Sequence, residues 1–187
     1  MSIFLRFNAL LDANVLYPAP IRDILLNLAE QELYSPKWSK TIEVEWTRNL
    51  LKNRPDLTMT KLERTVRAMN RAFPNARVRS YQKLIDELEL PDPDDRHVLA
   101  AAIKSESKAV ITFNKKDFQS KKIEKEYNIS ILAPDQFICR LSEMDVELTK
   151  QAFSNQLASL KNPPISKKRL LEILQKCGLK KSLEIFS

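Results

Sequence analysis

The sequence predicts an α/β protein in which a parallel β-sheet is flanked by helices and followed by a C-terminal helical appendage. Up to about residue 144, short apolar segments alternate with segments of helical periodicity, which is typical of strands and crossover helices in a parallel sheet. Beyond that point only amphipathic helical segments occur. Hydrophobic residues make up 43% of the 187 residues, enough for a sizeable core. We therefore expect a sheet domain at residues 1–144 and a helical extension at 145–187 packed on it.

The first half of the chain predicts one strand and two helices. Residues 7–11 are short and apolar, which indicates a buried strand that ends at Asp12. Residues 20–32 carry isoleucines and leucines at helical spacing. The segment 35–39 contains a proline and is expected to break that helix, and Ser39 can cap the next one. The apolar stripe of this second helix consists of Ile42, Trp46 and Leu50.

The second half of the chain predicts further helices and strands, and then helices alone. Prolines make residues 91–94 a rigid loop, after which Asp94 or Asp95 opens a helix at 96–105. The predicted strands are 76–78, 109–112 and 129–132, and the other predicted helices are 61–73, 81–88, 147–160 and 167–175, with a third element of the extension at 183–186.

Composition leaves carboxylates as the main catalytic material. The chain has one glycine, whereas Walker loops and dinucleotide-binding folds need several for close backbone approach to phosphate. Its single histidine excludes mechanisms that require two. Two cysteines outside any CxxC pair argue against a disulfide framework and against a cysteine zinc site, and they fit a reducing compartment.

Charge and apolar runs bear on partners and location. Lys and Arg total 31 against 24 Asp and Glu, a net charge of +7. This surplus favours polyanionic partners such as nucleic acid, but it fits a merely solvated basic surface equally well. No apolar run approaches the ~20 residues that cross a bilayer, and the first residues lack a signal-peptide pattern. We therefore expect a cytoplasmic protein that does not associate with membranes.

Two aspartates occupy positions that ordinary structural roles explain poorly. Asp12 directly follows a buried strand, and in a parallel sheet ligands bind beyond the carboxyl ends of strands. Asp95 shares its side of the predicted helix with Leu99 and Ala102, where an uncompensated carboxylate is costly. A bound cation would compensate both charges. A turn role for Asp12 and a helix-capping role for Asp95 remain the alternatives.

The glutamates of the second predicted helix cannot be separated by geometry. Glu43 and Glu45 are about 200° apart around a helix, so both cannot face one site. The apolar stripe lies slightly nearer Glu43, and helical glutamates are commonly solvated. In the predicted helix 96–105, His97 points away from Asp95 on a helical wheel, which favours a structural or surface role for the histidine. At least one of Asp92 and Asp94 is expected to be a solvated loop charge.

Four segments in order resemble the motifs of the PIN-domain family of metal-dependent ribonucleases, which includes VapC-like toxins. Residues 11–16 (LDANVL) resemble the first motif and place its aspartate at Asp12. Residues 39–50 are similar to the second, whose glutamate falls six residues after the serine, and this register selects Glu45. Residues 94–102 (DDRHVLAAA) resemble the third, with its aspartate at Asp95. Residues 112–118 (TFNKKDF) resemble the fourth, which contains Asn114 and Asp117.

The resemblance, which spans about residues 7–135, implies a PIN-like sheet and a metal-dependent endoribonuclease that acts as the toxin of a toxin–antitoxin pair. It implies that Asp12, Glu45 and Asp95 bind Mg²⁺ or Mn²⁺, the ions that carboxylate and water ligands suit. Asn114 would orient water or phosphate, and Asp117 would assist. The implied partners are an RNA substrate and a cognate antitoxin protein, and a homodimer is left open.

Two other function classes compete with this interpretation. Many relatives have an aspartate at the position of Asn114, so the chain could instead be a non-catalytic RNA- or partner-binding module. A phosphoacceptor signalling domain also gathers carboxylates at strand ends, but it needs paired acids near the first strand. Asp12 has no acidic neighbour, so this class is the least favoured.

Overall fold

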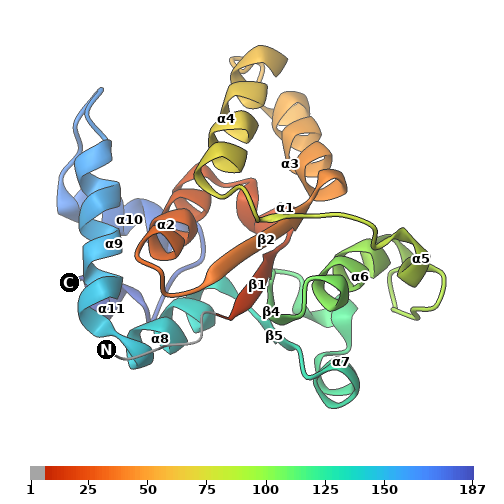
Figure 1. The fold of residues 1–187 in the computed structure, drawn as a ribbon. Coiled ribbons are helices and arrows are strands. Elements are labelled where there is room, and N and C mark those ends of the chain that lie inside the picture. The colour runs from red at the N-terminus through yellow and green to blue at the C-terminus, as the bar shows by residue number, and fades with distance from the viewer. Residues whose placement is uncertain (1–6) are drawn as a thin grey trace.

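A parallel sheet forms the centre of the protein, as predicted; it has five strands, one more than the four that the sequence predicted (Figure 1). The computed structural model describes residues 7–187. The strand order is β3-β2-β1-β4-β5, so β1 lies in the middle. Its residues Ala9, Leu10 and Leu11 are completely buried, which is expected of a strand covered on both faces. The strands are β1 (Asn8–Leu11), β2 (Ser35–Ser39), β3 (Arg77–Val78), β4 (Ser107–Ile111) and β5 (Ser130–Leu132).

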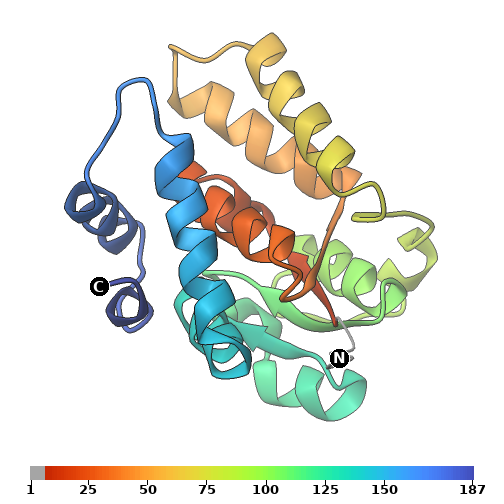
Figure 2. The same cartoon turned by 60° about the vertical axis from the view of Figure 1, so that its left-hand side comes forward.

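Helices cover both faces of the sheet, and two of them project from it. Helix α6 packs on β1, β2 and β4, whereas α2 packs on β2 from the opposite side (Figure 1). Helices α3 and α4 form an antiparallel pair that extends beyond the sheet (Figure 2). The helices up to residue 144 are α1 (Ala13–Leu16), α2 (Ala19–Glu30), α3 (Lys40–Asn53), α4 (Met59–Ala72), α5 (Gln82–Ile85), α6 (Arg96–Lys104), α7 (Ser120–Tyr127) and α8 (Pro134–Met144), with 3₁₀ turns η1 (Pro93–Asp95) and η2 (Lys115–Phe118).

The segment Ser35–Ser39, which the sequence predicted to be a helix break, is the strand β2. Its proline is tolerated for a geometric reason. The N–H of Ser35 donates to Phe7 O on the β1 side, so the next residue, Pro36, faces the other side. There β3 begins only opposite Trp38, and the missing N–H of Pro36 costs no ladder hydrogen bond. Ser39 caps α3 as predicted, because its Oγ accepts from the N–H of Ile42.

The C-terminal extension consists of the three predicted helices α9 (Val146–Ser159), α10 (Lys167–Lys176) and α11 (Leu183–Phe186). Helix α9 packs against α2 and α8 (Figure 2). Gln156 of α9 is buried and donates to Pro20 O at 3.0 Å, and Phe153 stacks on Phe186 at 4.7 Å between ring centroids. Within residues 7–187, no helix is both long enough and apolar enough to span a bilayer.

Candidate metal centre

The candidate site lies at the carboxyl edge of the sheet, where the neighbouring strands β1 and β4 end. Asp12 follows β1 and is only 5% exposed. Its Oδ2 accepts hydrogen bonds from Thr112 Oγ1 at 2.7 Å and from Asn14 Nδ2 at 2.8 Å. Its Oδ1 accepts from the N–H of Ala13 at 2.6 Å, which caps α1. The sequence analysis gave a turn role and a site position as alternatives for Asp12. In the structure Asp12 has both, because it caps α1 and lines the hollow described below.

Burial is the main influence on the ionisation of Asp12. It raises the pKa of this carboxyl group, and the charge of Glu45 raises it further. The hydrogen bonds from Thr112 and Ala13 lower the pKa but do not cancel the effect of burial. A nearby cation would stabilise the ionised form.

Asp95 stands at the start of α6, directly after η1. Its side chain makes no capping hydrogen bond, and its Oδ2 is buried without a hydrogen-bond partner among residues 7–187. Burial, followed by the charges of Asp12, Asp92 and Asp117, raises the pKa of Asp95 from 3.8 to about 6. The capping alternative is thus absent from this structure, and a buried carboxylate oxygen is left for another ligand.

An open hollow of about 420 Å³ brings Asp12, Glu45 and Asp95 together. Its other side is lined by residues of α3, among them Arg48 and Asn53. The hollow therefore contains the three residues predicted from the motifs to bind metal, drawn from three separate parts of the chain.

His97, for which the sequence favoured a structural or surface role, is mostly buried and contacts Glu45. Its Nε2 lies 2.9 Å from Glu45 Oε1, and its side chain is only 12% exposed. The helical wheel turned His97 away from Asp95 but could not show that α3 packs close to α6 at this point. His97 ties the carboxylate of Glu45 to the start of α6, and its charge lowers the pKa of both Asp12 and Asp95.

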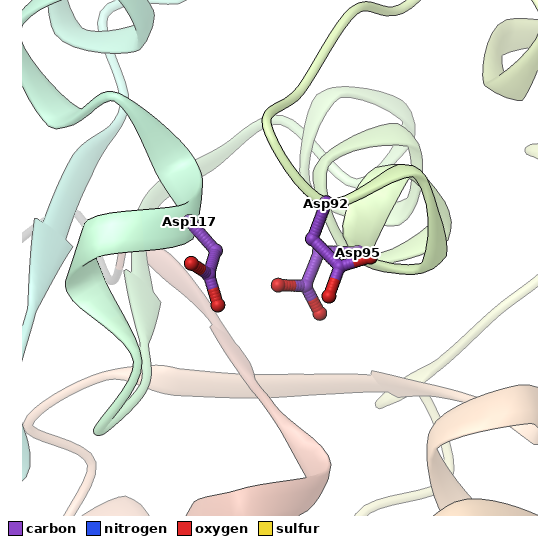
Figure 3. A group of neighbouring side chains, drawn as sticks. All are labelled: Asp92, Asp95 and Asp117. Atoms are coloured by element: carbon purple, nitrogen blue, oxygen red, sulfur yellow. The ribbon is translucent and has the colours of Figure 1, made fainter.

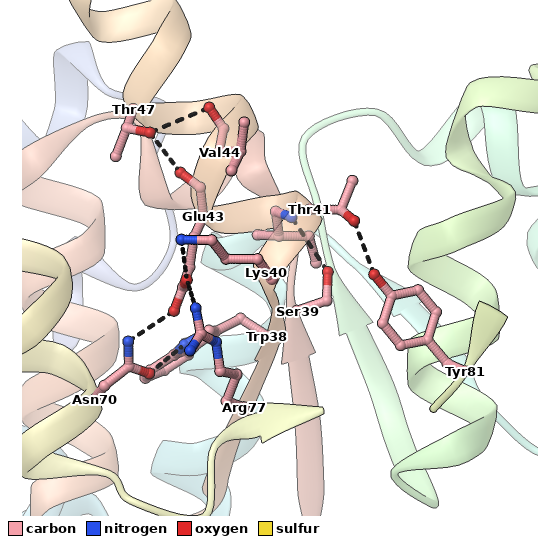
Figure 4. A network of polar contacts seen from close by, with 11 residues as sticks. Trp38, Ser39, Lys40, Thr41, Glu43, Val44, Thr47, Asn70, Arg77 and Tyr81 are labelled. Atoms are coloured by element: carbon pink, nitrogen blue, oxygen red, sulfur yellow. Dashed lines mark hydrogen bonds and ion pairs between the residues drawn. The ribbon is translucent and has the colours of Figure 1, made fainter. Parts of the chain in front are cut away.

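Glu43 belongs to a different polar network, on the side of α3 that faces α4 (Figure 4). Its side chain is 2% exposed and accepts hydrogen bonds from Asn70 Nδ2 at 2.7 Å and from Arg77 Nη2 at 2.6 Å. Asn70 Oδ1 in turn accepts from Trp38 Nε1 at 3.2 Å. The expectation of a solvated glutamate was therefore wrong for Glu43, which joins α3, α4 and β3. The structure separates the two glutamates that the wheel could not.

Three aspartates converge next to the hollow (Figure 3). Asp117 reaches in from η2, while Asp92 and Asp95 come from the loop before α6. One carboxylate oxygen from each lies within 4.8 Å of the others, and all three side chains are partly buried. The sequence predicted that at least one of Asp92 and Asp94 is a solvated loop charge; Asp94 is exposed, whereas Asp92 is partly buried. Its proximity to Asp117 follows from the neighbouring positions of β1, β4 and α6, which no local pattern reveals.

Asn114 connects the surroundings of Asp12 to Asp117. Its N–H donates to Thr112 Oγ1 at 3.0 Å, and its side-chain amide donates to the carboxylate of Asp117. Thr112 thus links Asp12 on one side to the backbone of Asn114 on the other. Sequence reasoning missed Thr112, although its place in the TFNKKDF segment is the signal that could have identified it.

Together, these side chains form an acidic centre that suits a hard divalent cation. Mg²⁺ and Mn²⁺ prefer carboxylate oxygens and water. Two of the carboxyl groups, Asp12 and Asp95, have raised pKa values mainly because they are buried, and Asp95 has an unpaired buried oxygen. Groups in such an environment are typical of functional sites.

Comparison with known proteins points to one family. The sequence model described as "PIN domain" matches residues 8–116, which is more than half of the chain. The model described as "VapC50 C-terminal domain" matches residues 134–185. The first match includes Asp12, Glu45, Asp95 and Asn114, and the second includes the whole of α8, α9 and α10.

One similar curated protein is "Putative ribonuclease VapC50" of Mycobacterium tuberculosis. It is 34% identical to this chain over 80 residues, which cover 43% of this chain and 47% of the relative. The match thus spans about half the length of that relative. No solved structure matches the chain.

Proposed function

The chain belongs to the PIN-domain family, and from that premise we propose that it is a VapC-like endoribonuclease that requires Mg²⁺ or Mn²⁺. The observation that carries the proposal is the meeting of Asp12, Glu45 and Asp95 around one hollow at the carboxyl edge of the sheet. The curated relative is called a ribonuclease, which supports the same activity.

The residues present fit a divalent cation. Asp12, Glu45 and Asp95 would hold it, and the unpaired buried Oδ2 of Asp95 supports this assignment. Asp92 and Asp117 approach Asp95 closely enough to contribute further oxygen ligands. When bound, the cation would supply Lewis acidity to a phosphoryl oxygen and make a water molecule more acidic.

The remaining side chains position these acids. Thr112 and Asn14 hold the Asp12 carboxylate by hydrogen bonds and so fix the direction of its oxygens. His97 does the same for Glu45. In our proposal Asn114 orients water or phosphate, and its hydrogen bond to Asp117 keeps that aspartate near Asp95. Such supporting contacts commonly tune metal sites as strongly as the ligands do.

A cleavage assay tests the activity. The purified 187-residue chain is incubated with total RNA in Mn²⁺, in Mg²⁺ and in EDTA, beside Asp95→Asn and the matched exposed control Asp86→Asn. We expect cleavage only with a divalent ion, a loss of several orders of magnitude in Asp95→Asn, and normal cleavage in Asp86→Asn. Equal cleavage by wild-type protein and Asp95→Asn would refute the proposal. RNA bound but never cleaved in Mn²⁺ would favour a non-catalytic binding module instead.

In our proposal the ribonuclease is the cytoplasmic toxin of a toxin–antitoxin pair, and a small antitoxin protein neutralises it by placing a segment in the acidic hollow. The VapC-like matches and the acidic chemistry of the hollow support this proposal. Induced expression in a bacterial host should arrest growth, and Asp95→Asn should relieve the arrest. Unimpaired growth with active, soluble wild-type protein would contradict the toxin role but not the nuclease activity. Size determination in solution tests the homodimer.

A further inference from the structure

The C-terminal extension returns to the sheet edge that carries the acidic centre. Gly178, the only glycine of the chain, ends α10 with a φ of +106°, a conformation that favours glycine. It lies against the ring of Phe113, because a Cβ added at Gly178 would be 3.2 Å from Phe113 Cε1. Phe113 directly follows Thr112, so this turn of the extension touches the loop that holds the site.

A second contact fixes the same turn to the end of the neighbouring strand. Asp135, three residues beyond β5, accepts hydrogen bonds from the N–H groups of Lys180, Lys181 and Ser182 at 2.8–3.1 Å and from Ser182 Oγ at 2.6 Å. Burial raises the pKa of Asp135, but these hydrogen bonds outweigh it and lower the pKa below its ordinary value. The turn 176–182 is therefore held at the carboxyl ends of both β4 and β5.

This turn carries a concentration of unpaired positive charge. Residues 145–187 contain eight Lys and Arg against four Asp and Glu, a surplus of four out of the chain's seven. Lys176, Lys180 and Lys181 lie within three residues of Gly178 and are exposed. Within the described part of the chain, none of the three side chains has an ion-pair partner. Lys116, in the adjoining loop, is also exposed.

Phe113 lies against the turn that carries these lysines, and 40% of its surface is exposed. Its backbone is held close to the site because its N–H donates to Asn14 Oδ1 at 3.0 Å, and Asn14 contacts Asp12. An exposed ring contributes little to a core, but a pre-positioned ring can stack on an unpaired base. An aromatic side chain among lysines is a typical combination for single-stranded nucleic acid.

We propose that Phe113 and the turn Lys176–Lys181 form a docking surface for single-stranded RNA next to the acidic centre. The ring of Phe113 stacks on a base, and Lys176, Lys180 and Lys181 neutralise phosphates on one side of the cleavage point. The extension is then part of the substrate-binding surface. This inference rests on the proposed function, because it takes RNA to be the substrate.

Binding is measured without cleavage by the fluorescence anisotropy of labelled single-stranded RNA with the full chain in EDTA. The test variant is the triple substitution Lys176→Gln, Lys180→Gln and Lys181→Gln. Each phosphate contact contributes about 0.7 to the slope of log affinity against log salt for single strands. We therefore expect the slope to fall by about 2, with weaker binding at low salt.

The matched control makes the same change of charge at the far end of α10. It carries Lys161→Gln, Lys167→Gln and Lys168→Gln. Lys167 and Lys168 start α10 and lie nine and eight residues before Lys176, about 12–14 Å along the helix axis, and Lys161 precedes the helix. We expect its salt slope to stay at the wild-type value. Equal slopes for wild-type protein and the test variant, or equal losses in test and control, would overturn the role of the turn. So would a test variant that keeps its RNA affinity but loses affinity for polyglutamate, because the turn would then fit an acidic protein segment.

The stacking role is tested by Phe113→Leu and Phe113→Tyr. Leucine keeps an apolar side chain against Gly178 but has no π-face, so we expect about tenfold weaker binding of single-stranded RNA. Tyrosine should restore most of the affinity. Wild-type affinity in Phe113→Leu would overturn stacking. These measurements are independent of catalysis: wild-type protein that binds RNA but never cleaves it would refute the proposed function alone, whereas cleavage with no effect of these variants on binding would refute only this inference.

Discussion

Replacing Asp95 by asparagine should stabilise the metal-free protein. The folded protein holds the pKa of Asp95 at about 6, against 3.8 for an unperturbed aspartate. The folded state therefore binds this proton more tightly than the unfolded state does. Metal-free wild-type protein should lose stability as the pH rises from about 4 to about 6, as the carboxyl group ionises. An asparagine side chain does not ionise in this range, so the loss should be absent from the variant.

The size of the effect follows from the shift. A difference of about 2 pKa units corresponds to about 3 kcal/mol when Asp95 is fully ionised. Asp95 is only partly buried, and solvent screens the repulsion from its neighbours, so the expected gain is about 1–2 kcal/mol. In a protein of this size, 1 kcal/mol shifts Tm by about 2–4 °C. Asp95→Asn should therefore melt roughly 2–8 °C above wild type at pH 7.5 in EDTA.

Thermal unfolding followed by circular dichroism measures this difference at pH 7.5 and at pH 4. At pH 4 the advantage of Asp95→Asn should largely disappear, since Asp95 is then protonated in wild-type protein. Adding Mn²⁺ at pH 7.5 should raise the Tm of wild type and have little effect on the variant. The exposed control Asp86→Asn should melt like wild type under every condition.

One result would refute this reasoning. If Asp95→Asn melts at or below the wild-type temperature at pH 7.5 in EDTA, then the Asp95 carboxylate is not destabilised by its surroundings. The unpaired Oδ2 of Asp95 would then need a different explanation, and its assignment as a metal ligand would lose its main physical support.

Three further substitutions separate positioning from general stability. Thr112→Val removes a hydroxyl that donates to the Asp12 carboxylate. The free energy of unfolding should fall by about 1–3 kcal/mol, and calorimetric titration should show weaker Mn²⁺ binding. His97→Ala should weaken Mn²⁺ binding by about 10–100-fold because Glu45 loses its partner, with partial recovery in His97→Gln. Glu43→Gln should lower the free energy of unfolding in urea by about 2 kcal/mol without changing Mn²⁺ affinity, because Glu43 joins α3, α4 and β3 and does not contact the acidic centre; a changed Mn²⁺ affinity would contradict that separation.

Periodicity was sufficient to predict most of the fold but not the strand β2 or the helices α7 and α8. Apolar runs predicted β1, β4 and β5, and helical spacing predicted α2, α3, α4 and the helices of the extension. The segment Ser35–Ser39 failed because its proline usually excludes a central strand. Only the short length of β3, a property of a distant segment, makes this proline acceptable. Local patterns contain no information of that kind.

The site, too, has features that the local sequence predicted and features that depend on distant segments. The burial of Asp12 agrees with its predicted position at a strand end, and the raised pKa of Asp95 agrees with its predicted position on an apolar helix face. Glu45 was chosen by motif register alone. It lines the hollow because α3 packs beside α1 and because Glu45 meets His97 of α6. His97 and Asp92 were missed because their partners, Glu45 and Asp117, lie on other elements.

The carboxyl edge of the sheet accounts for both the acidic centre and the role proposed for the extension. At this edge β1 presents Asp12, β4 presents Thr112 and Phe113, and β5 leads to Asp135. Asp12 beyond β1 and Asp117 beyond β4 are carboxylates that repel an RNA backbone until a cation is bound. Phe113 beyond β4 and Asp135 beyond β5 contact a turn whose lysines attract that backbone regardless of metal. A substrate would thus be retained by the extension and cleaved only when the acids are neutralised, so RNA affinity in EDTA and cleavage in Mn²⁺ should respond to different substitutions.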